Sequence, residues 1–404
     1  MSSPEEKEFG QRVAFLRKKL GYSQTEFARK IDRSETWLSQ VERGVRKIDR
    51  MSVLERLADA LDVQLTELAP ERRVVAASAP DDSRSSNLVM SLASNDALRA
   101  LLDTPQPVDI TDIEVRVERA WEFTHAARYE ELADLLVDLL ADVEVAERHA
   151  ADGERERVRR GKARVYLAAA GALSKLGETG PAWVAIDRAM VAAAQIGDPL
   201  MIAEAAFRLA ITFQAARRFD LATRVASTAA SAISTLTDTD DAAPAAVALL
   251  GALHLQLAVA AARSSDADTA YLHLGTAAAA AERIGEGRND YNTEFGPANV
   301  LLHEVAVAVE LGDAGRALRV ADRADPERLS PERRARLLID VASAHAQLRH
   351  PDAVVAALAE CMAIAPEQYA SHSRVRELVA DLLRSDHANN AEVRALADKI
   401  HIGS

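Results

Sequence analysis

Residues 23–44 read Ser23-Gln-Thr-Glu-Phe-Ala-Arg-Lys-Ile-Asp-Arg-Ser-Glu-Thr-Trp-Leu-Ser-Gln-Val-Glu-Arg-Gly44, and they contain two short helical patterns joined by a tight turn. Ser23 and Glu26 have the S-x-x-E spacing of a capping box, so the first helix can begin there. Ser34 is a good N-cap for the second helix, and Gly44 can end it. The stretch therefore predicts a helix-turn-helix, a motif whose second helix enters the major groove of DNA.

The flanking sequence completes a small helical domain. Apolar residues at helical spacing predict a first helix over residues 8–20 and a fourth over residues 52–61. A basic loop at residues 45–50 precedes that fourth helix, and a short piece at residues 65–68 would form a fifth. We therefore expect a five-helix domain within residues 1–70.

The charge of the chain is distributed unevenly. The net charge is −13, but residues 9–50 hold 11 Lys and Arg against 5 Asp and Glu, a balance of +6 that leaves −19 for the rest. Surface charges farther apart than about 8–10 Å are largely screened, so the local patch decides the attraction to phosphates. The basic N-terminal region can therefore bind double-stranded DNA although the whole protein is acidic.

One arginine and three short patterns relate this domain to a known family. They are Arg17, Ser23-Gln24-x-x-Phe27-Ala28, Leu38-Ser39-x-x-Glu42-Arg43-Gly44 and Leu57-Ala58-x-x-Leu61-Asp62-Val63. Over residues 9–69 the sequence resembles the Cro/C1-type (XRE) helix-turn-helix family of bacterial transcriptional regulators. The resemblance implies a DNA-binding domain and a structural ion pair between Arg17 and Glu42. Asp32, where glycine is usual, and Trp37 in the second helix depart from the family pattern.

Polar residues in and around the second helix are the candidate DNA contacts. If the helix docks as it does in the family, four side chains face the floor of the major groove: Glu35, Thr36, Ser39 and Gln40. Gln40 suits the N6/N7 edge of adenine, whereas Glu35 can accept a hydrogen bond from cytosine N4. Five further side chains are placed to contact phosphates: Gln24, Arg33, Arg43, Arg46 and Lys47. The alternative is a polar helical bundle that binds a protein partner.

A polar segment separates this domain from the rest of the chain. Pro80 is followed by Asp81-Asp-Ser-Arg-Ser-Ser-Asn87, which has no apolar residue. This composition predicts a linker over residues 71–87. A second domain then covers residues 88–404, beginning with a helix at about residues 88–102.

From residue 110 onward we find only helical patterns, and they occur in pairs. The first members begin at intervals of 35 to 52 residues, near Ile113, Val158, Met201, Ala246, Ala298, Arg333 and Arg374. Such intervals are typical of helical solenoids. Junctions such as Lys175-Leu-Gly177 and Glu310-Leu-Gly312 resemble those of tetratricopeptide repeats. We expect an all-α protein in which a tetratricopeptide-like solenoid of about seven helix pairs follows the N-terminal domain.

Several function classes lack their sequence signatures. The single cysteine, Cys361, allows neither an intrachain disulfide nor a cysteine-built metal site. The histidines show no H-E-x-x-H spacing, and the chain has no glycine-rich phosphate loop and no G-x-S-x-G motif. We therefore expect no enzymatic activity, no metal site and no cofactor. The absence of a long apolar run or a signal-peptide pattern predicts a cytoplasmic protein without membrane association.

Polar residues interrupt the otherwise apolar first helices of several pairs. The first helices of a solenoid line its concave groove, so these residues are candidate ligand contacts: Gln214, His254, Gln256, Asn299 and His303. Tyr291, Asn292 and Glu294 lie in a longer segment between two helices. The alternative is that such side chains are solvated or form buried hydrogen-bonded pairs.

Together these features predict a sequence-specific transcriptional regulator. One recognition helix reads only about four to six base pairs, so we expect a homodimer on a palindromic operator. The architecture resembles that of peptide-pheromone-responsive quorum regulators. This resemblance implies that the helical domain senses a peptide, a small molecule or a protein partner. The alternative is an interaction scaffold or antitoxin-like protein whose DNA binding is only autoregulatory.

Overall fold

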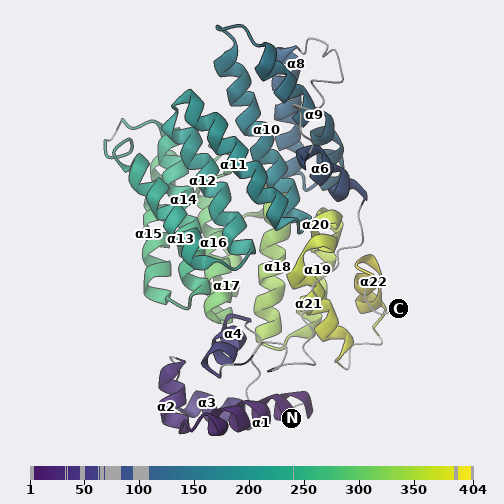
Figure 1. Cartoon of the computed structure of the whole chain (residues 1–404). Helices are drawn as coiled ribbons and strands as arrows, with labels where there is room; N and C mark the ends of the chain where they lie inside the picture. The colour runs from purple at the N-terminus through teal and green to yellow at the C-terminus, as the bar shows by residue number, and fades with distance from the viewer. Residues whose placement is uncertain are drawn as a thin grey trace. The chain divides into compact units, whose positions relative to one another are not determined.

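A computed structural model describes residues 4–31, 33, 35–45, 51–61, 63, 68, 83–93, 109–239, 241–385 and 390–401. The chain divides into two compact units, the N-terminal unit (Met1–Ser78) and the helical array (Ala79–Ser404). Every regular element in the described ranges is a helix, as Figure 1 shows. The predicted all-α fold class is therefore confirmed.

The N-terminal unit contains α1 (Pro4–Lys19), α2 (Gln24–Lys30), α3 (Glu35–Glu42) and α4 (Met51–Ala60). The capping box of α2 is confirmed, because Ser23 and Glu26 each accept a hydrogen bond from the backbone of the other. The helix α1 begins four residues before the predicted start at Glu8. The predicted N-cap Ser34 lies outside the described residues, as do Asp32 and residues 65–67 of the predicted fifth helix. Its last residue, Leu68, belongs to the core with other fully buried side chains: Val13, Phe27, Leu38, Leu57 and Leu61.

The helices α1 and α3 cross so closely that only glycine fits at the contact. A Cβ atom on Gly10 would lie 2.3 Å from the carbonyl oxygen of Val41 and 2.7 Å from that of Glu42. Both neighbours are backbone atoms of the second helix of the helix-turn-helix, so they cannot rotate away.

Replacing Gly10 with alanine is expected to lower the stability of the N-terminal unit by about 1–3 kcal/mol, the usual range for overpacking a close contact. Hydrogen exchange of the α1 and α3 amides in the full-length chain measures the effect. Gln11→Ala, at an exposed neighbouring position, is the control. Equal protection in Gly10→Ala and the parent protein would show that α1 and α3 are farther apart than described.

The helical array consists of one leading helix, α6 (Ser83–Ala93), and seven successive pairs in the described residues. The pairs are α8 (Ile110–His125) with α9 (Tyr129–His149), α10 (Arg155–Lys175) with α11 (Thr179–Ile196), α12 (Pro199–Ala215) with α13 (Phe219–Ser234), α14 (Pro244–Arg263) with α15 (Ala267–Ile284), α16 (Pro297–Leu311) with α17 (Ala314–Ala321), α18 (Pro331–Gln347) with α19 (Pro351–Ile364), and α21 (Ser373–Leu383) with α22 (Ala391–Lys399). The short α20 (Pro366–Ser371) precedes the last pair. Every predicted first helix begins within three residues of its expected start. The prediction of a solenoid of about seven pairs is confirmed.

The start of the array differs from the sequence prediction. The helix α6 begins at Ser83, five residues before the expected start at Leu88, so residues 83–87 are helical although they were predicted as linker. Leu88 and Leu92 of α6 are buried in the core formed by the first and last pairs. Burial of this apolar stripe stabilises the helix despite its polar first turn. Residues 94–108 lie outside the described ranges.

Small residues allow the helices of the array to pack closely. The helix α14 is the most completely buried of the described helices, with Gly251 and eleven alanine or leucine residues on both sides of it in the core. Contrary to the sequence prediction that the chain has no long apolar run, this helix is long and apolar enough to cross a membrane, but 83% of its most apolar window is buried inside the array. That burial is what a core helix of a large helical domain shows.

The two ends of the array meet. Residues of α8, α9 and α10 share one hydrophobic core with residues of α18 to α22. The Tyr129 hydroxyl on α9 donates a hydrogen bond to the Gln368 Oε1 atom on α20 at 3.1 Å, and Lys175 on α10 forms an ion pair with Glu332 on α18. Consecutive first helices also contact one another from α10 to α18. The solenoid therefore curls until its first two pairs touch α18 and α20 near its other end (Figure 1).

Candidate functional site

The helix α3 presents a polar face on the N-terminal unit. Its apolar side, Leu38 and Val41, is fully buried against the core. The four predicted base-reading residues lie on the opposite side, with Glu35 and Thr36 exposed and Ser39 and Gln40 half-buried. Successive members of this set are one, three and one positions apart in the sequence, which places all four on one face of the helix.

A buried ion pair fixes α3 relative to α1. Arg17 donates from Nε and Nη2 to the two carboxylate oxygens of Glu42, at 2.5 and 2.9 Å, and both side chains are only 6% exposed. Arg17 Nη1 also donates to the carbonyl oxygen of Tyr22 at 2.6 Å. Gln24 adds a hydrogen bond to Glu42 Oε2 at 2.6 Å. One arginine thus joins α1, the turn before α2 and the end of α3.

Two of the predicted DNA contacts already have partners inside the unit. The Gln24 amide is bonded to Glu42, and Glu35 accepts a hydrogen bond from the Thr25 hydroxyl at 2.7 Å. Both bonds are made between helices, so sequence spacing alone did not reveal them. Either side chain can contact DNA only if it breaks this internal hydrogen bond or bonds to its partner and to the DNA at the same time.

The remaining predicted phosphate contacts differ in exposure. Arg43 is exposed, and its Nε donates to the carbonyl oxygen of Ser39 at 3.3 Å. Arg33 is half-buried, with its guanidinium 5.7 Å from the centre of the Trp37 ring. Trp37 itself packs against the core, which favours a structural role over base reading. Arg46 and Lys47 lie outside the described residues and stay predictions.

If about five phosphates are neutralised by each N-terminal unit, the logarithm of DNA affinity should fall with the logarithm of salt concentration with a slope of roughly −4 to −5 per unit. Replacing Arg46 and Lys47 with alanine should make the slope shallower by about 2 without changing the preferred sequence. Fluorescence anisotropy over a range of salt concentrations measures the slope. A slope that does not change in the double variant would remove this loop from the set of phosphate contacts.

Most of the predicted groove residues form side-chain hydrogen bonds with other residues of the helical array. Gln214 donates to both the side-chain and main-chain oxygens of Gln256, at 3.0 and 3.2 Å, and the two residues are buried. The Nδ1 atoms of His254 and His273 lie 3.0 Å apart, so one of them donates to the other. Burial lowers the pKa of His254 to about 4, which keeps it neutral at physiological pH. These three predicted residues form hydrogen-bonded pairs between helices.

Asn299 and His303, on consecutive turns of α16, are different because each keeps a polar atom without a partner. Asn299 is 4% exposed, and its Oδ1 atom has no hydrogen-bond partner among the described residues. His303 is 1% exposed, and its Nδ1 atom is bonded to the carbonyl oxygen of Asn299. Its Nε2 atom likewise has no partner in the described part of the chain. Buried polar atoms without a partner are uncommon in proteins, and each calls for an explanation such as a bound water or ion.

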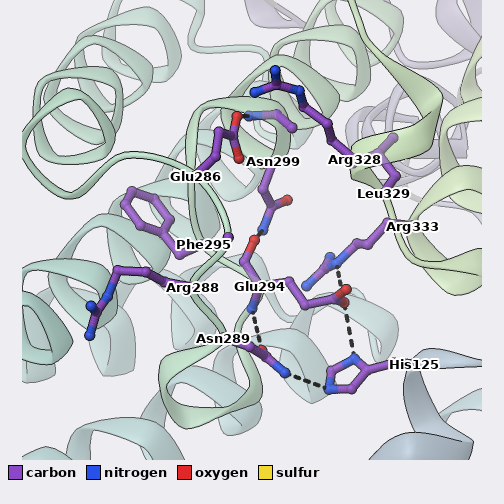
Figure 2. A pocket seen from close by; sticks show the side chains of 12 residues that line it. His125, Glu286, Arg288, Asn289, Glu294, Phe295, Asn299, Arg328, Leu329 and Arg333 are labelled. Atoms are coloured by element: carbon purple, nitrogen blue, oxygen red, sulfur yellow. Dashed lines mark hydrogen bonds and ion pairs between the residues drawn. The ribbon is translucent and has the colours of Figure 1, made fainter.

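A cavity of about 310 Å³ adjoins Asn299 (Figure 2). It is bounded by the C-terminal end of α8, the loop between α15 and α16, the start of α16, and the segment leading into α18. Its principal polar lining residues are His125, Glu286, Arg288, Glu294, Asn299 and Arg333. Of the five predicted groove residues, Asn299 is the one that lines this cavity.

Charged side chains that the sequence analysis did not select face the interior. On α12, Glu204 is 2% exposed and its Oε1 atom has no partner among the described residues. Burial raises the pKa of Glu204 to about 7, although the neighbouring charge of Arg208 opposes the shift. Burial also lowers the pKa of Arg208 to about 10. Its guanidinium lies 4.9 Å from the centre of the Trp121 ring.

The helix α18 carries the clearest signal that sequence analysis could have used. Its polar residues recur every three or four positions on one face: Glu332, Arg336, Asp340 and Ser343. On a helix whose other faces are apolar, such a stripe indicates a polar interior or a solvent-exposed side. The structure selects the interior, because Glu332 and Ser343 are 7% and 1% exposed and Glu332 forms an ion pair with Lys175.

The sequence of residues 8–70 matches the family described as a helix-turn-helix domain. The chain carries a helix-turn-helix domain. This domain coincides with α1 to α4, so α3 is its second, recognition helix. No curated protein sequence matches the whole chain significantly.

Solved structures extend the comparison to the part of the chain that follows the helix-turn-helix domain. The chain is similar to a Rap protein that was crystallised in a complex with Competence and Sporulation Factor, with 13% identity and a TM-score of 0.50 over 90% of this chain and 99% of that one. This similarity shows a shared fold. PlcR of Bacillus thuringiensis, solved with the peptide PapR7 and DNA, matches at 14% identity over 69% of this chain and 95% of its own, with a TM-score of 0.33. ComR of Streptococcus vestibularis, solved in its apo form, matches at 10% identity over 94% of this chain and 98% of its own, with a TM-score of 0.20. These two scores are too low to carry an argument.

Proposed function

We propose that this protein is a sequence-specific, DNA-binding transcriptional regulator that acts in the cytoplasm and has no enzymatic activity. The helix-turn-helix domain is the observation that carries the proposal. Its recognition helix is held by a buried ion pair and presents Glu35, Thr36, Ser39 and Gln40 on one face. A rigid helix with a polar outer face is what base reading in the major groove requires.

The helical array is the proposed effector-binding and dimerising part. Its fold is shared with a Rap protein that binds Competence and Sporulation Factor, which supports a role in sensing a peptide, a small molecule or a protein partner. A homodimer would place two recognition helices on half-sites about one helical turn, roughly 34 Å, apart on a palindromic operator. An effector can change operator affinity only to the extent that it binds the two states of the protein unequally.

Gln40→Ala is the substitution that tests base reading most directly. Losing a bidentate contact to one adenine should weaken specific binding by about 1–3 kcal/mol, or roughly 5-fold to 150-fold. Binding to random DNA should change by less than twofold, because phosphate contacts remain. Both affinities are measured by anisotropy on the selected operator and on a shuffled duplex. Equal losses on the two duplexes would mean that Gln40 stabilises the domain instead of reading a base.

A further inference from the structure

The loop at residues 285–296, between α15 and α16, contacts the first helices of the array and buries Thr293 and Phe295. His125 on α8 is bonded to Glu294 Oε2 and to the Asn289 amide, each at 3.1 Å. Arg208 on α12 donates to the carbonyl oxygen of Asn292 at 2.7 Å. The loop therefore bridges helices that are more than 80 residues distant in the sequence.

Two further first helices hold the next residues of the loop. Arg333 on α18 donates from Nη2 to the carbonyl oxygen of Thr293 at 3.1 Å and from Nε to Glu294 Oε2 at 3.2 Å. Asn299 on α16 donates to the carbonyl oxygens of Thr293 and Glu294, at 3.1 and 3.0 Å. Figure 2 shows Arg333 and His125 converging on Glu294 from two sides.

The aromatic residue that follows fills a slot in α14. Phe295 is 1% exposed, and a Cβ atom on Gly251 would lie 2.0 Å from its Cζ atom. Glycine at position 251 thus makes room for the ring. The interior of the array recognises three features of this segment: main-chain carbonyl oxygens, one carboxylate and one aromatic ring. These are features of a peptide, and the donors that read them come from four different helix pairs.

The loop fits this site incompletely. Tyr291 and Glu294 have φ angles of 52° and 48°, in the left-handed region that costs side chains such as these about 1 kcal/mol or more each. The 310 Å³ cavity lies between the loop and the segment leading into α18, and Asn299 Oδ1 beside it has no hydrogen-bond partner among the described residues. A segment with fewer backbone constraints can satisfy the same donors and also fill the cavity.

We propose that His125, Arg208, Asn299, Arg333 and the Gly251 slot form a peptide-binding site, and that the 285–296 loop occupies this site as an internal competitor. The peptide it takes presents an acidic side chain followed directly by an aromatic one, as Glu294 and Phe295 do. This inference rests on the proposed effector-binding role of the array and specifies the chemistry of the effector. If the loop is seated for about 99% of the time, the apparent affinity for a free peptide is about 100-fold weaker than the intrinsic one.

The test uses the full-length chain and a fluorescent peptide with the sequence of residues 291–296, Tyr-Asn-Thr-Glu-Phe-Gly, blocked at both ends. In the variant Glu294→Ala/Phe295→Ala the loop loses its carboxylate and its ring, while the donors of the site remain. Fluorescence anisotropy should show at least 10-fold tighter peptide binding to this variant than to the parent protein. A peptide with alanine in place of its glutamate should lose most of that gain, because Arg333 and His125 then have no carboxylate to bind.

Two further variants keep the test decisive. If circular dichroism shows that the double variant loses helix, Glu294→Ala alone is used, and the expected gain is about threefold or more. Arg218→Ala is the matched control, because Arg218 lies outside the cavity lining and makes a solvent-exposed ion pair with Asp220 at the start of α13. It should bind the peptide as the parent protein does. Peptide affinities that are equal in the parent and in a folded variant, or equal for the glutamate and alanine peptides, would overturn the inference.

The same samples separate this inference from the proposed function. Operator affinity is measured with and without saturating peptide. A peptide that binds as expected but leaves operator affinity unchanged would support the site and count against effector control of DNA binding. A peptide that fails to bind, in a protein that still binds its operator, would overturn the site and leave the DNA-binding role intact.

Discussion

Arg17→Ala is expected to lower the stability of the helix-turn-helix domain by about 3–5 kcal/mol, because it leaves the Glu42 carboxylate buried without its cation. Both partners are 6% exposed, so solvent cannot replace the lost interaction. Gln24 would remain as a neutral donor to Glu42, and the carbonyl oxygen of Tyr22 would lose its partner. Hydrogen exchange of the α2 and α3 amides in the full-length chain measures the loss.

Two further variants serve as controls for the effect of Arg17→Ala on stability. Lys18→Ala, at the exposed neighbouring position of α1, should change stability by less than about 0.5 kcal/mol. Arg17→Leu combined with Glu42→Leu should recover much of the stability, because replacing a buried pair with apolar residues is often neutral. A loss below about 1 kcal/mol in Arg17→Ala would show that the pair is solvated in solution.

Glu204→Gln is expected to stabilise the helical array at alkaline pH. In the folded protein, burial raises the pKa of Glu204 to about 7, above its ordinary value of 4.5. The folded state therefore holds the proton more tightly than the unfolded state, and stability falls as pH rises from the unfolded pKa through the folded one. Above pH 7, the ionisation of buried Glu204 therefore lowers the free energy of unfolding by about 3 kcal/mol. Glutamine removes this pH-dependent loss because it carries no charge at any pH.

Thermal unfolding at pH 5 and pH 8 measures the effect of Glu204→Gln. The variant should melt several degrees above the parent protein at pH 8 and close to it at pH 5. Glu327→Gln, at a side chain that is 88% exposed, should show no such dependence on pH. If the melting temperatures of the variant and the parent protein differ by the same amount at pH 5 and pH 8, Glu204 is already ionised at pH 5 in the folded protein. It would then have a partner that the structure does not show.

Local sequence signals predicted the fold well. The capping box at Ser23 and Glu26 places the start of α2, because both of its hydrogen bonds form within four residues. The first helices of the array are marked by their apolar periodicity, and proline at the first position reinforces the start of α12, α14, α16 and α18. Such signals depend on neighbouring residues only. They fail at Ser83, where the polar first turn of α6 is held by burial of leucines farther along the helix.

The candidate site depends on contacts that no local pattern encodes. His125 and Glu294 are 169 residues apart, and Lys175 and Glu332 are 157 residues apart, so these pairs form only when the solenoid curls and brings distant repeats together. Gln214 and Gln256 are 42 residues apart, close to the interval between successive first helices, but Gln214 lies near the end of α12 and Gln256 lies in the middle of α14. Comparing successive repeats at this interval would have suggested a contact between these two neighbouring first helices. It would not have identified the loop, since the 285–296 segment has no counterpart in the other repeats.

Selection of bound duplexes from a random DNA pool by the full-length protein tests the central claim most directly. The account predicts enrichment of a palindrome whose half-sites are centred about one helical turn apart. In Gln40→Ala the preference should weaken at one symmetric position in each half-site, with the spacing unchanged. A pool that shows no enriched sequence after repeated rounds, although the protein is folded and binds DNA in low salt, would contradict the assignment of this chain as a sequence-specific regulator.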